Sequence, residues 1–218
     1  MFPSMTEHNL FDEVKEDLER QRLEALWKQY GLWVVILALG IVLATASSTA
    51  YHSWQANQNQ KLTSELLAVS KTSADTSKNI EALQKFADSN AASNQAAFAL
   101  LHAGALAADE NDKAKAATLF DQVAADTKID PAFRQLGDLL SVQAQLDSAD
   151  PATLSARLQP LTEEHATWRY SALEAEGYLA LKSGDKDKAK QIFTTLSQDA
   201  RAPQSIGARA SDILRSLN

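Results

Sequence analysis

The stretch LLHAGALAADENDKAKAATLFDQV, residues 100–123, returns later in the chain as LEAEGYLALKSGDKDKAKQIFTTL, residues 173–196. The two stretches match at a constant offset of 73 residues. The matched pairs are Leu100 with Leu173, Gly104 with Gly177, Asp112 with Asp185, Lys113 with Lys186, Ala116 with Ala189, and Phe120 with Phe193. Self-similarity at a fixed spacing is the signature of a repeat protein. The sequence therefore predicts several copies of one structural unit.

Each copy has the pattern of two antiparallel helices. A small residue such as Gly104 at one crossing point lets two helices approach closely, while a large residue such as Phe120 fills the groove beside it. Asn111 and Gly184 stand where the first helix must end, because both residue types tolerate the left-handed conformation that ends helices. The Asp after each of them can cap the second helix.

Two further copies complete the series. Because 73 is close to twice a period of about 36, a middle copy is expected, with Phe133 and Gly137 in the places of Leu100 and Gly104. An insertion around residues 147–151 moves its second helix to residues 151–161. A first copy lies upstream, since four residues precede their counterparts by 34: Leu66, Ser70, Ala82 and Phe86.

The tail, residues 204–217, carries its apolar residues on one face and is expected to cap the stack, because a terminal repeat has no further neighbour to bury it. The pattern of small and large residues resembles the tetratricopeptide repeat. That resemblance implies an all-α fold, a right-handed solenoid of antiparallel helix pairs. The alternative is an unrelated helical bundle.

Residues 32–51, LWVVILALGIVLATASSTAY, contain no charged residue. A helix of about 20 apolar residues spans a bilayer core of about 30 Å. Trp33 at one end and Tyr51 with Trp54 at the other are typical of the aromatic belts at membrane interfaces. We therefore predict a single transmembrane helix within residues 31–54. The alternative is a cleaved signal peptide, since Ala44-Thr45-Ala46 and Ser48-Thr49-Ala50 resemble cleavage sites, and it would give a soluble periplasmic repeat protein.

Basic residues set the predicted orientation, because they accumulate on the cytoplasmic side of a span. Four precede the span and one follows it within a similar distance: Lys15, Arg20, Arg22 and Lys28 against Lys61. Residues 1–30 are therefore predicted to be cytoplasmic, and residues 55–218 to be a repeat domain on the other side of the membrane. Residues 9–30 have the pattern of an amphipathic helix, which is either a docking face or the lead-in to the span.

Composition excludes several classes of function. The 218 residues include no Cys, and 21 basic against 28 acidic residues give a net charge of -7. This balance argues against nucleic acid as a partner, since phosphate binding needs clustered Lys and Arg. The four His are scattered without metal-ligand spacing, and no phosphate-binding glycine loop or nucleophile elbow is present. The sequence predicts no enzyme activity, no cofactor, no metal and no small-molecule substrate.

What remains is a binding surface. The first helices of stacked pairs line a concave face on which peptides commonly bind. The repeat pattern places five residues near that face, and a sixth, an aromatic residue, precedes the last pair: Phe98, Leu101, Arg134, Tyr178 and Leu181, and Trp168. The alternative is that these side chains only pack the core.

Two N-terminal motifs, FDEVKEDL at residues 11–18 and WKQYG at residues 27–31, precede one span and a helical repeat domain. This layout resembles the YfgM-type ancillary subunits of the SecYEG translocon. The resemblance implies a single-pass protein of the bacterial inner membrane with a cytoplasmic N-terminus and a periplasmic tetratricopeptide-like domain. It also implies three partners: the SecYEG translocon, a periplasmic chaperone and membrane lipid. The alternative function is a membrane-anchored scaffold for envelope or cell-division assembly.

Overall fold

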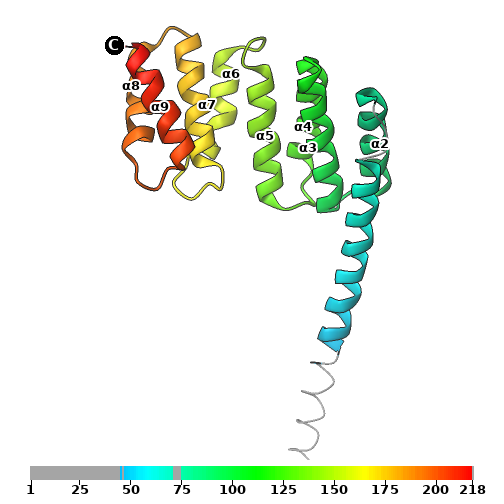
Figure 1. Ribbon diagram of the computed structural model, residues 1–218. Coiled ribbons are helices and arrows are strands. Elements are labelled where there is room, and N and C mark those ends of the chain that lie inside the picture. The colour runs from blue at the N-terminus through cyan, green and yellow to red at the C-terminus, as the bar shows by residue number, and fades with distance from the viewer. Residues whose placement is uncertain (1–44, 46, 71–74, 218) are drawn as a thin grey trace, which may run out of the picture. The chain divides into compact units, whose positions relative to one another are not determined.

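The structure is a computed structural model that describes residues 45, 47–70 and 75–217. Residues 47–69 are helical, and eight α-helices and one 3₁₀ helix follow in the described part of the chain (Figure 1). They are α2 (Thr76–Ser89), α3 (Asn94–Asp109), α4 (Lys113–Ala125), α5 (Pro131–Gln145), α6 (Pro151–Leu158), η1 (Gln159–Leu161), α7 (Arg169–Lys182), α8 (Lys186–Gln198) and α9 (Gln204–Leu217). The predicted all-α fold is confirmed.

The chain divides into two units between residues 59 and 60. In the first unit, the described residues 45 and 47–59 are helical and exposed. The predicted amphipathic helix over residues 9–30 and most of the predicted span over residues 32–51 lie outside the described residues. Among the helices that the structure describes, none combines the length and the apolar character needed to cross a membrane.

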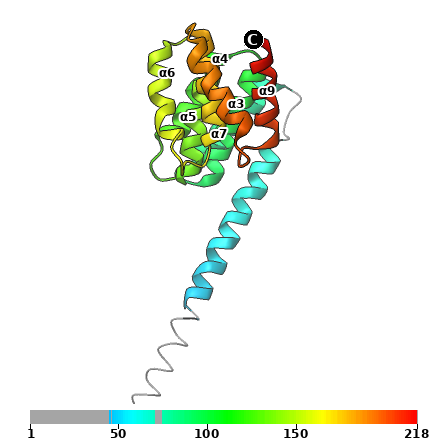
Figure 2. The ribbon, with the colours of Figure 1, turned by 90° about the vertical axis from the view of Figure 1, so that its left-hand side faces the viewer.

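The second unit is a row of helices that run alternately up and down in chain order (Figure 1), and Figure 2 looks along this row. Every helix from α2 to α9 packs against the next one along the chain, and α3, α5, α7 and α9 also contact one another in that order. This is the contact pattern of stacked helix pairs, in which each pair touches only its neighbours. The pairs are residues 60–69 with α2, α3 with α4, α5 with α6, and α7 with α8.

The turns inside two pairs are equivalent, as the 73-residue offset predicts. Asn111 and Gly184 adopt the left-handed conformation, with φ of 62° and 81°. The next amide in each case, that of Asp112 or Asp185, donates at 2.9 Å to a carbonyl in the last turn of the first helix. Each of these Asp side chains then accepts from the backbone N–H three residues on, at 3.0 Å, and so caps the second helix.

The same two pairs are closed by contact between a glycine and an aromatic ring. A Cβ atom placed on Gly177 would lie 2.7 Å from the Phe193 ring, and one on Gly104 would meet the Phe120 ring even more closely. Both rings are buried, and Phe193 is fully inaccessible to solvent. The missing side chain is therefore what allows each first helix to approach its partner, as the sequence predicts.

The middle pair departs from the predicted register. Gly137 was expected to take the place of Gly104, but it lies against α4, the helix of the preceding pair: a Cβ there would lie 2.8 Å from the Phe120 carbonyl oxygen. The small residue that faces α6 is the fully buried Ser141, one helical turn later. Ser141 lies 37 residues after Gly104 and 36 before Gly177, so the structural period is more even than the steps of 33 and 40 residues that Gly137 would give.

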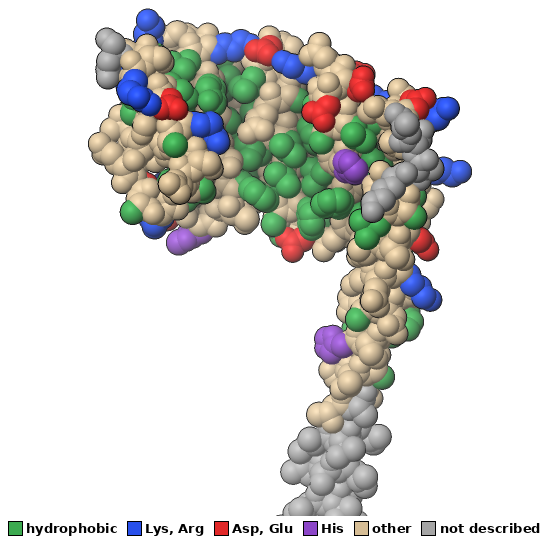
Figure 3. Space-filling view, viewed as in Figure 1, with side chains coloured by type: hydrophobic (Ala, Val, Ile, Leu, Met, Phe, Trp, Pro, Cys, Tyr) green, Lys and Arg blue, Asp and Glu red, His purple; other side chains and the backbone are tan. Residues whose placement is uncertain are grey.

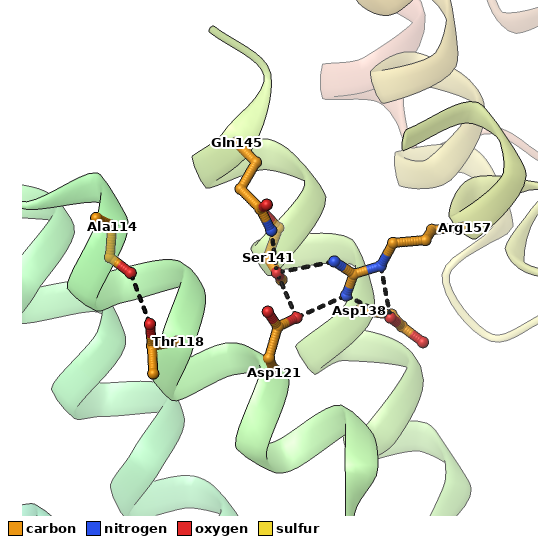
Figure 4. A network of polar contacts seen from close by, with 7 residues as sticks. All are labelled: Ala114, Thr118, Asp121, Asp138, Ser141, Gln145 and Arg157. Carbon is orange, nitrogen blue, oxygen red and sulfur yellow. Dashed lines mark hydrogen bonds and ion pairs between the residues drawn. The ribbon is translucent and has the colours of Figure 1, made fainter. Parts of the chain in front are cut away.

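A guanidinium closes this pair instead of an aromatic ring (Figure 4). Arg157 of α6 donates at 2.7 Å to Asp121 of α4 and at 2.7 Å to Asp138 of α5. Ser141 accepts from Arg157 at 3.3 Å and donates to Asp121 at 2.6 Å. Burial disfavours the charged guanidinium, but its hydrogen bonds to the two carboxylates outweigh burial and raise the pKa of Arg157. The charge therefore joins three helices from neighbouring pairs.

The last helix, α9, covers the end of the row. Ile206 and Ala210 are buried against α7 and α8, while the opposite face of α9 is exposed. Arg209 holds α9 to α7 through a bidentate pair with Glu174, at 2.6 and 2.7 Å. The predicted capping helix over residues 204–217 is confirmed with the same bounds.

Candidate functional site

An apolar groove runs across the first helices of the first three pairs. It consists of two adjoining cavities of about 510 and 340 Å³. Ser70, Phe98 and Phe133 line both cavities, so the two form one continuous groove. The other lining residues of the larger cavity are Leu101, His102, Ala132, Leu136 and Trp168, and those of the smaller are Thr63, Leu66, Leu67, Asn94 and Gln95.

Large apolar side chains stand exposed in this groove. Phe98 is 53% exposed and Leu67 is 56% exposed, although their neighbours Leu66 and Leu101 are buried. In the view of Figure 3, hydrophobic side chains gather in the hollow over α3 and α5, while charged side chains lie mainly around it. Exposed apolar groups that cluster on a soluble domain mark an interaction surface, whereas scattered ones do not.

Trp168 closes the end of the groove nearest α7. Its indole Nε1 donates at 2.8 Å to the carbonyl oxygen of Ala132, in the first turn of α5. The bond fixes the ring orientation, since the indole has only this one polar group. Trp168 precedes α7 directly and is partly buried against the core of the middle pairs. One aromatic side chain thus joins two repeats and ends the groove.

The described residues that line the groove are uncharged. Among the described residues, no Lys, Arg, Asp or Glu lines either cavity. The polar groups present are hydroxyls, amides and one imidazole: Thr63, Ser70, Asn94, Gln95 and His102. A charged group that entered this groove would lose water without gaining an ionic partner, at a cost in free energy. The groove therefore favours an uncharged occupant.

The structure brings together three of the six residues predicted to bind a partner, because Phe98, Leu101 and Trp168 all line the groove. Arg134 lies on α5, partly buried, and lines neither cavity. Tyr178 packs edge-on against the Phe193 ring, with centroids 5.6 Å apart, and Leu181 packs on the core cluster shared with α9. Neither residue lines either cavity; Tyr178 remains 39% exposed, whereas Leu181 is partly buried.

Sequence reasoning missed Leu67, His102, Phe133 and Leu136 as groove residues. Phe133 was predicted as the large residue of its repeat, but not as part of a surface. The doublet Leu66–Leu67 carried a partial signal: adjacent residues on a helix point in different directions, so a leucine beside a core leucine is a candidate for an exposed or groove-lining position.

A second groove, between α6 and α8, is polar. Its cavity of about 520 Å³ has Glu176 of α7 in its floor, and one carboxylate oxygen of Glu176 accepts from Ser155 at 2.8 Å and from Lys188 at 2.5 Å. The equivalent residue 73 positions earlier is Ala103, which is fully buried. These contacts tie α6 and α8 to α7. Within the described residues, no cluster of three His, Asp or Glu side chains is placed to hold a metal ion.

Comparisons with known proteins agree with this architecture. The family model described as a tetratricopeptide repeat-like domain matches residues 24–211. The ancillary SecYEG translocon subunit of Aggregatibacter actinomycetemcomitans is 25% identical over 198 residues, which cover 87% of this chain and 92% of that protein. The resemblance noted from the sequence is thereby confirmed. No solved structure matches the chain. Because the family match takes in most of its length, the chain belongs to the tetratricopeptide repeat-like domain family.

Proposed function

We propose that this protein is an ancillary subunit of the Sec translocon, anchored in the inner membrane, whose repeat domain assists exported proteins or organises the chaperones that receive them. The observation that carries the proposal is the similarity to an ancillary SecYEG translocon subunit along 87% of the chain. The repeat architecture and its apolar groove support a binding role rather than catalysis.

The proposed topology places residues 31–54 in the membrane, residues 1–30 in the cytoplasm and residues 55–218 in the periplasm. Its support is the charge-free stretch of residues 32–51 and the excess of basic residues before it. An anchor of this kind confines the repeat domain to a thin layer at the membrane surface. Its effective concentration for a neighbouring channel is then high, so weak contacts suffice.

The proposed partner-binding face is the groove that contains Phe98, Leu101 and Trp168. A chaperone or an exported polypeptide on this face would lie close to the channel exit, since the groove begins at Thr63, only 12 residues after Tyr51. Even a fully extended chain of that length reaches no more than about 43 Å. The proposal therefore requires that the partners be found near the membrane surface.

The experiment is affinity isolation of the full chain from crosslinked inner membranes, with its neighbours identified by mass spectrometry. The expected result is enrichment of the translocon subunits and of a periplasmic chaperone. A matched variant replaces residues 32–51 with an unrelated apolar helix of equal length. If this variant still retrieves the translocon, residues outside the span carry the association. Absence of translocon subunits from the wild-type isolate would contradict the proposal.

Two simpler measurements test the topology. A reporter fused after Asn218 is expected to be active on the periplasmic side, and a cytosolic reporter signal would contradict the assignment. The mass of the protein purified from membranes is expected to include residues 1–50. A shorter form that begins near Ala46 or Ala50 would mean that the segment is a cleaved signal peptide and that the anchor is lost.

A further inference from the structure

We infer that the groove between residues 63–70, α3 and α5 binds short, uncharged apolar segments of polypeptides that have not yet folded, and that it selects them by composition rather than by sequence. The inference deepens the proposed function and rests on it for the cellular context, because it names the class of ligand that the binding face accepts. The binding itself is a property of the groove alone.

The first step of the argument is the chemistry of the lining. The groove presents Phe98, Phe133, Leu67 and Leu136 beside the Trp168 ring, and no acidic or basic side chain from the described residues enters it. Removal of apolar surface from water is favourable for any apolar ligand. An Asp, Glu, Lys or Arg of the ligand would instead be desolvated without a partner. Charge complementarity therefore selects an uncharged, apolar occupant.

The second step concerns the backbone of the occupant. A polypeptide segment that leaves water must satisfy its N–H and C=O groups. The neutral polar side chains of the groove, among them Asn94, Ser70 and His102, can accept or donate hydrogen bonds irrespective of the ligand side chains. A groove with an apolar floor and uncharged polar groups therefore recognises the backbone and the apolar side chains of its ligand. Among the described residues that line it, none is charged, so no ionic contact with them would fix one particular sequence.

The third step identifies the state of the ligand. Folded soluble proteins rarely expose contiguous apolar patches of more than a few hundred Å². A polypeptide that has not yet folded exposes such segments along its length. The two adjoining cavities have volumes of about 510 and 340 Å³ and lie across three helices, so they suit a few consecutive side chains of a strand-like or helical segment.

The test uses the full chain in nanodiscs of phosphatidylethanolamine and phosphatidylglycerol, and three fluorescein-labelled twelve-residue peptides. The first peptide contains Leu, Phe and Val among Ser and Gly. The second has the same composition in scrambled order, and the third carries Asp in place of three apolar residues. We expect the first two to bind within about threefold of each other, and the third at least about tenfold more weakly, measured by fluorescence anisotropy.

Matched variants locate the site. Phe98→Asp and Leu67→Asp change exposed side chains and are each expected to weaken peptide binding at least about tenfold, whereas Phe98→Leu retains it. Tyr178→Asp is the control, since Tyr178 is also an exposed aromatic residue but lies outside the groove. Far-UV circular dichroism checks that each variant keeps its helical content. Unchanged binding by Phe98→Asp, or equal binding of the Asp-containing peptide, overturns the inference.

Two other occupants would also overturn it. Concentration-dependent self-association that Phe98→Asp abolishes would mean that a second copy fills the groove, and analytical ultracentrifugation detects this. Failure of all three peptides to bind would leave a folded partner as the ligand. The result is separable from the proposed function: peptide binding without translocon co-isolation refutes only the proposed function, and translocon co-isolation without peptide binding refutes only this inference.

Discussion

The pairs α3/α4 and α7/α8 are each closed by a phenylalanine ring that lies on a glycine, whereas the pair α5/α6 is closed by a guanidinium between two carboxylates. The apolar crossings gain stability from close packing and from burial of a large ring. The polar crossing depends on hydrogen bonds and charge, which water and salt weaken. One repeat geometry is thus maintained by two kinds of interaction, and they should respond differently to substitution, to salt and to pH.

The largest expected effect is loss of a ring from an apolar crossing. Phe193→Ala should lower the free energy of unfolding by about 3–5 kcal/mol, because Phe193 is fully buried and the substitution leaves a cavity. Phe98→Ala should cost about 1 kcal/mol or less, because half of that side chain is already exposed. Urea unfolding followed by far-UV circular dichroism measures both. Similar losses in the two variants would contradict the assignment of Phe193 to the core and Phe98 to the surface.

The polar crossing should be weaker and sensitive to salt. Arg157→Met should lower the free energy of unfolding by about 1–2 kcal/mol, since Asp121 and Asp138 lose their shared cation but are themselves partly exposed. A triple variant that adds Asp121→Asn and Asp138→Asn should recover about half of that loss.

Salt distinguishes this crossing from the apolar ones. Between about 0.05 and 1 M NaCl, the difference in unfolding free energy between wild type and Arg157→Met should shrink, because the ion pair is screened. The difference between wild type and Phe193→Ala should stay constant over the same range. A salt-independent Arg157→Met effect would show that packing of the Arg157 side chain, rather than its charge, holds α6 in place.

A third, smaller effect tests the glycine in an apolar crossing. Gly177→Ala should destabilise by about 1 kcal/mol, because its Cβ would overlap the Phe193 ring by more than the gain in helix propensity repays. Gly207→Ala in α9 is the matched control: its Cβ meets only Leu196 O at 3.5 Å, so the substitution should stabilise by up to about 1 kcal/mol. Combination with Phe193→Leu should remove the Gly177→Ala penalty in a double-mutant cycle.

The smallest effect is a pH dependence of the free energy of unfolding that arises from Asp147, beside the α5/α6 pair. Asp147, which follows α5, accepts a hydrogen bond from Lys113 of α4 at 2.7 Å, and this bond, with the positive charges of Lys113 and Lys182, lowers the pKa of the carboxyl. A lowered folded-state pKa contributes stability above the ordinary pKa of Asp, about 3.9, and that stability is lost as the pH falls through the lowered value.

Asp147→Asn should therefore lower the urea midpoint slightly at pH 7 and have a smaller effect at about pH 2.5. Urea unfolding of both proteins at the two pH values measures this change. A difference of equal size at both pH values would mean that the carboxylate charge does not stabilise the fold. The effect should be small because the ion pair is exposed to solvent.

Several features of the fold followed from the sequence because they depend on residues a few positions apart. Asn111 and Gly184 had to end helices, and Asp112 and Asp185 had to cap the next ones, whatever the rest of the chain did. The predicted register of the middle pair was wrong by one helical turn, because a glycine can allow close approach to either of two neighbouring helices. Gly137 admits the helix of the preceding pair, and the inconspicuous Ser141 occupies the crossing with α6.

The Arg157 cluster was not predictable for a different reason. It joins side chains that are 16, 19 and 36 residues apart, and no periodic pattern marks them. The groove was partly predictable, since Phe98 and Leu101 follow from the repeat pattern and Trp168 was noted as the aromatic residue before the last pair. Tyr178 and Leu181 lie on α7 outside both cavities, and Leu181 packs on the core cluster that α9 shares. Only the tertiary packing decides which apolar residues stay accessible.

Because the described groove lining is uncharged, ligand binding to it should show a characteristic heat-capacity change. Contacts between apolar surfaces bind with a negative heat-capacity change, and their strength declines on cooling. An ion pair with a client would not behave in this way. Titration calorimetry of the inferred apolar peptide at several temperatures should therefore show a binding enthalpy that becomes more negative as the temperature rises.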